Sequence, residues 1–126
     1  MKYFWIPAAV LALLLGASLW NAAAMDAAVT PWRAALTDAQ DAAARGNWDG
    51  AARIVRETRE AWEAKHAYFH IVTAHDELDA ADELFAAAEG FAAERDEPEF
   101  RVAAAQLDVQ LRVVAEMQRL TVKNVL

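Results

Sequence analysis

The chain has 126 residues, of which 57% are hydrophobic and only four are glycine and three proline. This length accommodates one domain with an accessory segment and excludes two independent cores. Alanine, the best helix former, is the commonest residue, so the composition predicts an all-α fold. The absence of cysteine excludes disulfides, thiolate metal sites, thiol catalysis and a lipoprotein cysteine anchor.

The charge is distributed unevenly along the chain. From residue 26 to 126, 11 Lys and Arg stand against 19 Asp and Glu, which leaves a net charge of −8. Such a surface repels phosphate, so we expect no nucleic-acid partner. Anionic lipid headgroups are poor partners for the same reason, except at a small local basic patch.

The amino-terminal segment has the properties of a membrane helix. Residues 3–20 carry no charge, and 18 residues at about 1.5 Å each reach about 27 Å, close to the hydrocarbon thickness of a bilayer. Tyr3, Trp5 and Trp20 are placed as in aromatic belts, and Lys2 puts positive charge at the first end. We therefore predict a single-pass anchor over residues 1–25, with a cytoplasmic amino terminus and an extracytoplasmic helical bundle over residues 26–126.

A cleaved signal peptide is the alternative interpretation of this segment. Lys2 would supply the charged region, residues 6–19 the apolar region and the alanines at 22–24 the cleavage site, and the protein would then be secreted. The bulky Trp20 and the length of the apolar run favour the anchor. Both interpretations place residues 26–126 outside the cytoplasm.

The next elements are predicted from capping residues. Thr30 followed by Pro31 indicates a helix start, and the helix is expected to continue to about Arg45; the alternative is a membrane helix that continues unbroken with a kink at Pro31. Gly46 is typical of a helix terminator and Asn47 of the next cap, so a tight helical hairpin follows.

Residues 47–95 keep one helical rhythm of apolar residues and contain all three histidines. We predict one continuous, bent helix there, with a restart near Thr73 as the alternative. Asp96 and Pro98 begin the last helix, whose second apolar stripe is free for the helix that carries Trp32 or for an external partner; this stripe comprises Val109, Val113 and Leu120. The predicted architecture is a membrane helix followed by a small antiparallel bundle of three helices, a helical hairpin plus a long helix pair.

Four residues of the central helix have metal-ligand spacing. Glu63, His66, His70 and Glu77 would lie along one side of it, where a zinc site and a solvated polar stripe are the two interpretations. The Glu-x-x-His pattern of di-iron bundles occurs only once, so we expect no cofactor.

His75 has a different environment in the predicted helix. It lies beside the apolar stripe with Asp79 one turn further on, which predicts a buried or half-buried His75–Asp79 pair with a structural role, or else a pH-responsive contact. The only serine is Ser18, which excludes a Ser-His-Asp hydrolase. The neighbouring acidic residues are interpreted as a solvated face, so we expect no enzymatic activity; they are Asp76, Glu77, Asp79, Asp82 and Glu83.

Several motifs together resemble a known family. They are the membrane helix, the Asn47-Trp48-Asp49 turn, Trp62, a His-x-Glu-hydrophobic-Asp block at residues 75–79 and the ending Leu-Thr-x-x-Asn-hydrophobic-Leu at residues 120–126. In these the chain resembles an uncharacterised bacterial family, found largely in Gram-positive bacteria, whose domain has no known function. The resemblance implies an N-terminally anchored helical protein without an assigned activity.

Two functions from different classes follow. The first is a membrane-tethered, non-enzymatic interaction or scaffold protein, with another membrane protein or a second copy as its partner. The alternative is an extracytoplasmic metal- or pH-sensing module that uses the histidines of the central helix.

Overall fold

The computed structural model describes the backbone of residues 3–125 and their side chains except those of residues 72, 118 and 120–125. The described part consists of five α-helices and contains no strand, which confirms the all-α prediction. The helices are α1 (Trp5–Ala44), α2 (Trp48–Ala64), α3 (His66–Val72), α4 (His75–Glu94) and α5 (Glu97–Val125).

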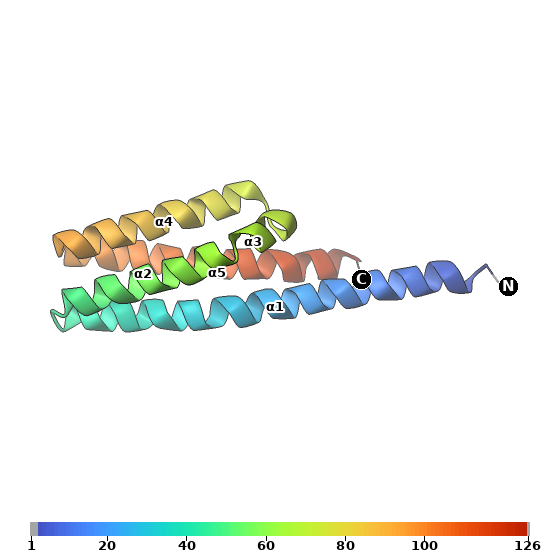
Figure 1. Ribbon diagram of the computed structural model, residues 1–126, viewed down its shortest axis with the longest axis horizontal. Coiled ribbons are helices and arrows are strands. Elements are labelled where there is room, and N and C mark those ends of the chain that lie inside the picture. Colours follow the sequence, from blue (N-terminus) through green and yellow to red (C-terminus); the bar gives the residue numbers. More distant parts are fainter. Residues whose placement is uncertain (1–2, 126) are drawn as a thin grey trace.

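Four of the helices form an antiparallel bundle. The second half of α1 packs against α2 and α5, and α4 packs against α5 and α2, while the short α3 joins α2 to α4 at one end (Figure 1). The first half of α1 protrudes from that same end. The sequence predicted three helices in the bundle, and this number is wrong because four helices pack together. The predicted antiparallel arrangement is correct.

Helix α1 passes through the predicted start at Thr30 and Pro31 without interruption, so the predicted cap there is wrong. The Thr30 hydroxyl donates instead to the Asp26 carbonyl at 2.8 Å. A proline inside a helix costs about 3 kcal/mol. One face of α1 is buried on both sides of Pro31, where Met25, Val29 and Trp32 are at most 7% exposed. Burial of each side chain contributes about 2 kcal/mol, so their combined contribution exceeds the cost of the proline.

The hairpin between α1 and α2 forms as predicted. Gly46 has a φ of +80°, and its N–H donates to the Ala43 carbonyl at 2.9 Å, while the Asn47 N–H donates to the Ala42 carbonyl at 2.8 Å. These are the two hydrogen bonds of a Schellman turn. The Asn47 side chain then caps α2 by accepting the Gly50 N–H at 3.0 Å.

The central helix predicted over residues 47–95 is divided, so the continuous helix is wrong. Thr73 and Ala74 adopt extended conformations between α3 and α4, with ψ of 150° and 137°. A helix from Trp48 to Glu94 would be about 70 Å long, whereas the half of α1 inside the bundle is about 30 Å long. The apolar stripe of the central segment is therefore covered only when the chain folds back on itself.

The turn between α4 and α5 follows the predicted cap. Arg95 adopts a left-handed conformation with a φ of 56°, and the Asp96 side chain accepts the Glu99 N–H at 3.3 Å. The apolar face that α5 turns to the other helices is at most 3% exposed; its residues are Phe100, Ala103, Ala104, Leu107, Leu111 and Val114. Met117, further along α5, is half-buried. Val109, in the second stripe, remains 45% exposed, and the side chain of Leu120 lies outside the described residues.

An aromatic cluster occupies the centre of the bundle. Trp62 is fully buried, and its ring lies 4.9 Å from that of Phe69, 5.9 Å from Phe85 and 6.0 Å from Trp32 between centroids. These rings come from α1, α2, α3 and α4, so the cluster fixes α3 to the bundle.

Candidate functional site

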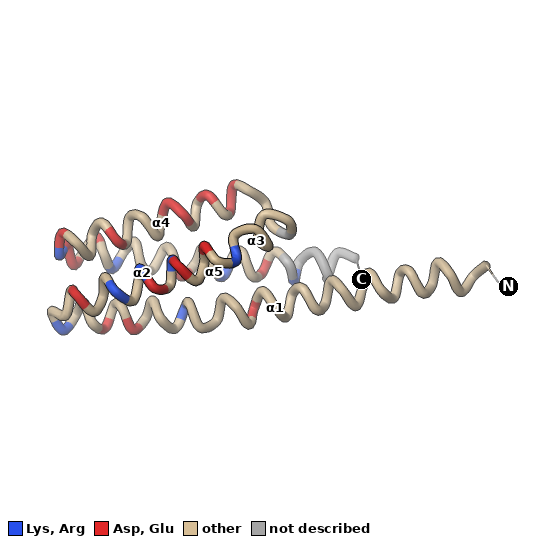
Figure 2. The backbone as a smooth tube through the Cα atoms, viewed as in Figure 1, with Lys and Arg blue, Asp and Glu red and all other residues tan. Residues whose placement is uncertain are grey.

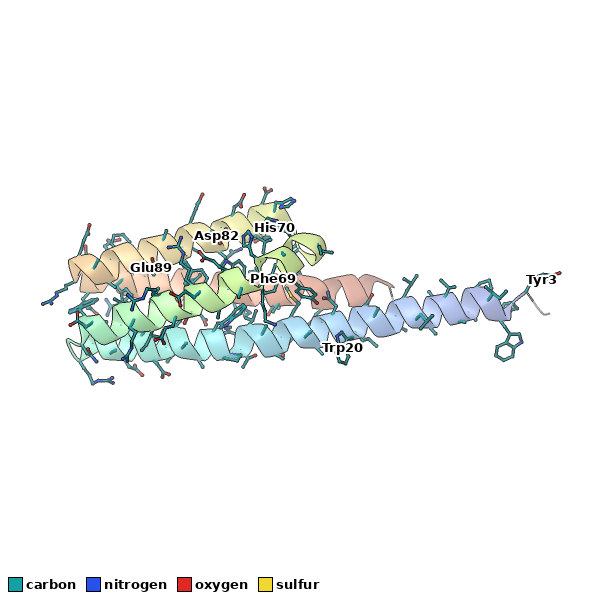
Figure 3. All side chains as sticks on the ribbon, in the orientation of Figure 1. Tyr3, Trp20, Phe69, His70, Asp82 and Glu89 are labelled. Atoms are coloured by element: carbon teal, nitrogen blue, oxygen red, sulfur yellow. The ribbon has the colours of Figure 1, made fainter. Side chains whose placement is uncertain are left out.

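A polar cluster lies between α2 and α4, at the edge of the aromatic core. The Trp62 Nε1–H donates to Asp82 Oδ1 at 2.7 Å, and His66 Nε2 lies 3.4 Å from Asp82 Oδ2. Arg59 pairs with Glu89 at 2.9 Å and with Glu63 at 3.2 Å. Figure 3 shows Asp82 and Glu89 on the α4 side of this polar cluster.

The cluster surrounds a shallow pocket lined by Arg59, Glu63, His66 and Asp82. Sequence reasoning placed Asp82 among the solvated acidic residues and missed its role. The signal was available in Trp62, because a buried indole N–H needs an acceptor. Asp82 thus serves as the hydrogen-bond partner that permits burial of Trp62.

The three histidines form a row along α3 and into the start of α4, because His66 and His70 lie in α3 and His75 begins α4. The rings of His66 and His70 have centroids 4.2 Å apart, and His70 Nδ1 lies 2.8 Å from His75 Nδ1. The predicted burial of His75 is wrong, because His75 and Asp79 are both exposed and the ring of His75 contacts His70. The physical reason is the break at Thr73, which makes His75 the first residue of α4.

The residues predicted as zinc ligands are held by other partners. Glu63 pairs with Arg59, His66 with Asp82, and Glu77 accepts the Gln110 amide at 2.7 Å. Among the side chains that the structure describes, no group of three histidines or carboxylates is close enough to share a metal ion. His66 and His70 are neighbours, but Glu63, His66, His70 and Glu77 do not converge on one metal position.

The protruding half of α1 is apolar and exposed. Tyr3, Trp5 and Trp20 are 85%, 76% and 78% exposed, whereas Lys2 lies outside the described residues. Figure 2 shows no charged residue on this half, and Figure 3 places Tyr3 and Trp20 along it. Helix α1 is long and apolar enough to cross a membrane, and only 11% of its most apolar 18-residue stretch is buried in the protein. A membrane anchor and a signal sequence both have these properties.

Polar contacts join α1 to the bundle just beyond the apolar run. The Tyr68 hydroxyl donates to the Asn21 side chain, and Arg119 pairs with Asp26.

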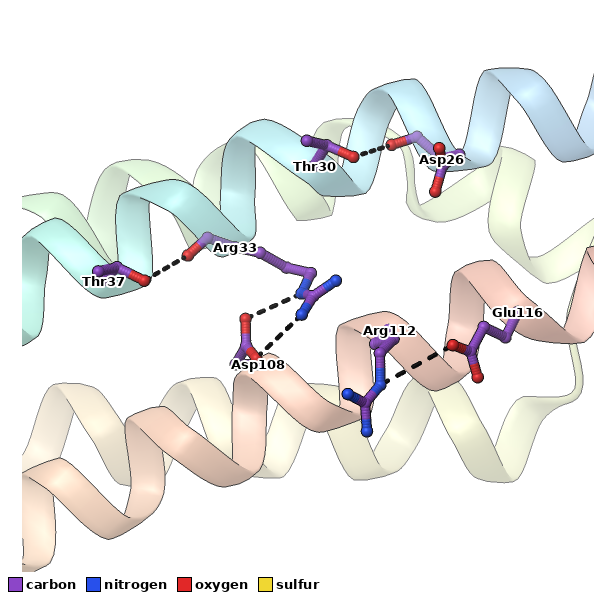
Figure 4. Close-up of polar contacts among 7 residues, drawn as sticks. All are labelled: Asp26, Thr30, Arg33, Thr37, Asp108, Arg112 and Glu116. Atoms are coloured by element: carbon purple, nitrogen blue, oxygen red, sulfur yellow. Dashed lines mark hydrogen bonds and ion pairs between the residues drawn. The ribbon is translucent and has the colours of Figure 1, made fainter.

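Further along α1, the Arg33 guanidinium donates to both oxygens of Asp108, at 2.9 and 3.3 Å (Figure 4). The hydrogen bond to Asp108 raises the pKa of Arg33, while burial acts in the opposite direction. Arg33 lies 13 residues beyond Trp20, outside the apolar run. The anchor-like helix and the bundle are thus one connected unit.

Comparison with known proteins assigns the chain to a family. The model of a domain of unknown function (DUF4363) matches residues 19–125, and the chain belongs to this family. No curated protein and no solved structure matches the chain significantly. The match agrees with the resemblance noted in the sequence to a family without a known function.

Proposed function

We propose that this protein is a membrane-tethered, non-enzymatic helical module that presents its bundle to a partner at the membrane surface. The observation that carries the proposal is the division of α1 into an exposed apolar half and a half whose residues, such as Met25 and Leu36, are fully buried in the bundle. Lys2 at the first end favours a cytoplasmic amino terminus and an extracytoplasmic bundle.

The contacts of Asn21 and Met25 support a retained anchor over a cleaved signal peptide. Cleavage after Ala24 would remove the bond between Asn21 and Tyr68 and would make Met25 the new amino terminus. Met25 is fully buried, so the charged amino group would be generated at a buried position, which is unfavourable. A retained α1 keeps the hydrogen bond between Tyr68 and Asn21 and avoids a buried charge at Met25.

The anchor is tested on the full chain expressed in bacteria. We expect the protein to stay in the membrane fraction after alkaline carbonate extraction and to have the intact mass of residues 1–126. Leu13→Lys places a charge at the middle of the apolar run and serves as the control that should release the protein. Recovery of a soluble protein that begins at Met25 would contradict the anchor.

The surface proposed for the partner is a shallow groove between α4 and α5. Its lining is largely apolar, and Val109 is 45% exposed; the lining residues are Leu84, Ala105, Gln106, Val109 and Gln110. The proposed partner is another membrane protein or a second copy of the chain. The backbone N–H and C=O groups of both helices are already hydrogen-bonded within the helices. A partner can therefore cover this apolar surface without burying unpaired backbone groups.

A photo-crosslinking residue at Val109 tests this surface in intact membranes. We expect an adduct from position 109 and none from the matched exposed position Arg53 on α2. Mass spectrometry of the adduct distinguishes a second copy from a different membrane protein. No adduct at position 109, together with a monomeric protein in detergent, would contradict the interaction function.

A pH-responsive junction is a second candidate function, favoured by the contact between His70 and His75. Nitrogen atoms 2.8 Å apart require one imidazole to donate and the other to accept. If both rings are protonated, the hydrogen bond is lost and two positive charges face each other, at a cost on the order of 1 kcal/mol near the surface. Acidification would therefore loosen α3 from α4.

Amide hydrogen exchange of residues 66–75 tests the pH response. Histidine side chains usually titrate between about pH 5 and 8, so protection is compared at both limits after correction for intrinsic exchange. We expect acid to lower protection in the natural chain and to have a smaller effect in His75→Gln. Equal changes in the two proteins would contradict this function.

A further inference from the structure

The turn that contains α3 exposes apolar side chains at one end of the bundle. Ile71 is 84% exposed and Tyr68 is 39% exposed, although neighbouring Phe69 is fully buried in the aromatic cluster. Phe69 therefore holds the helix in place while Ile71 points away from the core. An aliphatic side chain this exposed, on a helix fixed to the core, has no role in packing within the chain.

The same turn differs in charge from the rest of the bundle. Residues 64–75 contain no Asp or Glu, and this is the longest such stretch after Asp26. Lys65, His66 and His70 lie within it. In Figure 2 the acidic residues lie on α2 and α4 on either side, and α3 carries none. The turn is the local exception to the acidic surface.

The fold places this turn beside the end of the apolar run. The Tyr68 hydroxyl donates to Asn21, the residue directly after Trp20. Figure 1 shows α3 at the end of the bundle from which the first half of α1 emerges. An α1 that spans the bilayer up to Trp20 would bring α3 to the level of the lipid headgroups, where aromatic and aliphatic side chains insert.

We propose that the turn over residues 65–74 lies on the bilayer surface, with the Ile71 side chain among the lipid headgroups. The proposal rests on the membrane anchor proposed above and adds a second contact between the protein and the same membrane. The occupant is a lipid surface because the turn adjoins the apolar run and lacks the acidic residues that would be repelled by anionic lipids. Two contacts at one end hold the bundle in a fixed orientation, with its long axis directed away from the membrane.

Site-directed spin labelling tests the contact, because the chain contains no cysteine and each introduced cysteine is the only label site. Full-length Ile71→Cys, Val102→Cys and Leu13→Cys are labelled and reconstituted in vesicles of phosphatidylcholine and phosphatidylglycerol. Accessibility to oxygen, which partitions into lipid, is compared with accessibility to a water-soluble nickel chelate.

Val102 is the matched aqueous control. It is an exposed aliphatic residue like Ile71, at 50%. The pairing of Arg33 with Asp108, together with the antiparallel course of α5, places Val102 about 27 Å further from the span than Asn21 along the bundle. Leu13, in the middle of the apolar run, is the lipid control.

The expected result is an oxygen-to-nickel accessibility ratio several-fold higher at position 71 than at position 102, and highest at position 13. A ratio at position 71 equal to that at position 102, with a lipid-like ratio at position 13, would overturn the surface contact and leave the anchor intact. An aqueous ratio at position 13 would overturn the anchor and this inference together.

Discussion

The hydrogen bond from Trp62 to Asp82 makes the most direct test of how the bundle is held together. Trp62 is fully buried and its indole donates to Asp82 at 2.7 Å. Trp62→Phe removes the donor, Asp82→Ala removes the acceptor, and the double variant removes both. The three variants form a double-mutant cycle that isolates the interaction from the loss of packing.

The magnitudes follow from burial. A hydrogen bond to a charged group contributes about 1.5–3 kcal/mol, and because the Asp82 side chain is 38% exposed we expect a coupling energy near the lower limit, about 1.5 kcal/mol. Trp62→Phe also leaves a void beside Phe69 and Phe85, so its total cost should be about 3 kcal/mol. Asp82→Ala leaves the indole N–H unpaired and should cost about 2 kcal/mol.

The assay is urea denaturation of the full chain in detergent micelles, followed by circular dichroism. Asp82→Asn keeps an acceptor and serves as the matched control, with a smaller loss than Asp82→Ala. A coupling energy below about 0.5 kcal/mol, which is the usual error of additivity, would refute the assignment of Asp82 as the partner that stabilises the buried indole.

Three further predictions concern helix ends and use the same denaturation assay. Arg95→Gly should stabilise the protein by about 0.5–1 kcal/mol, because Arg95 has a φ of 56°, whereas Arg95→Lys should leave stability unchanged; a loss with glycine would contradict the strain. Asn47→Ala should cost about 1 kcal/mol and Asn47→Ser much less, since serine also caps; equal losses would exclude a capping role. Gly50→Ala should gain less than the usual ~1 kcal/mol, because the new Cβ would lie 2.5 Å from Asn47 Nδ2 and displace the cap; the full gain would contradict this clash.

The candidate site was only partly accessible from the sequence. The spacing of Glu63, His66, His70 and Glu77 assumed one helix. The chain breaks at Lys65 and again at Thr73, so these residues belong to α2, α3 and α4. The contact between His70 and His75 depends on the direction of the chain after the break. A helical periodicity specifies which residues share a face only as long as the helix continues.

The sequence by itself determined the features that depend on neighbouring residues. The Gly46–Asn47 hairpin, the Asp96 cap and the exposed apolar run that ends at Trp20 follow from local conformational preference, hydrogen bonding and hydrophobicity, which act within a few residues.

Only the tertiary structure decided where helices continue and where they stop. Pro31 favours a helix start, yet α1 continues because Met25 and Val29 before it and Trp32 after it all pack against the other helices. Thr73 lies in a segment with unbroken helical rhythm, yet the chain turns there because α4 buries its apolar face only when it lies beside α2 and α5. In both places the free energy of burying distant residues together exceeds the local preference of the backbone.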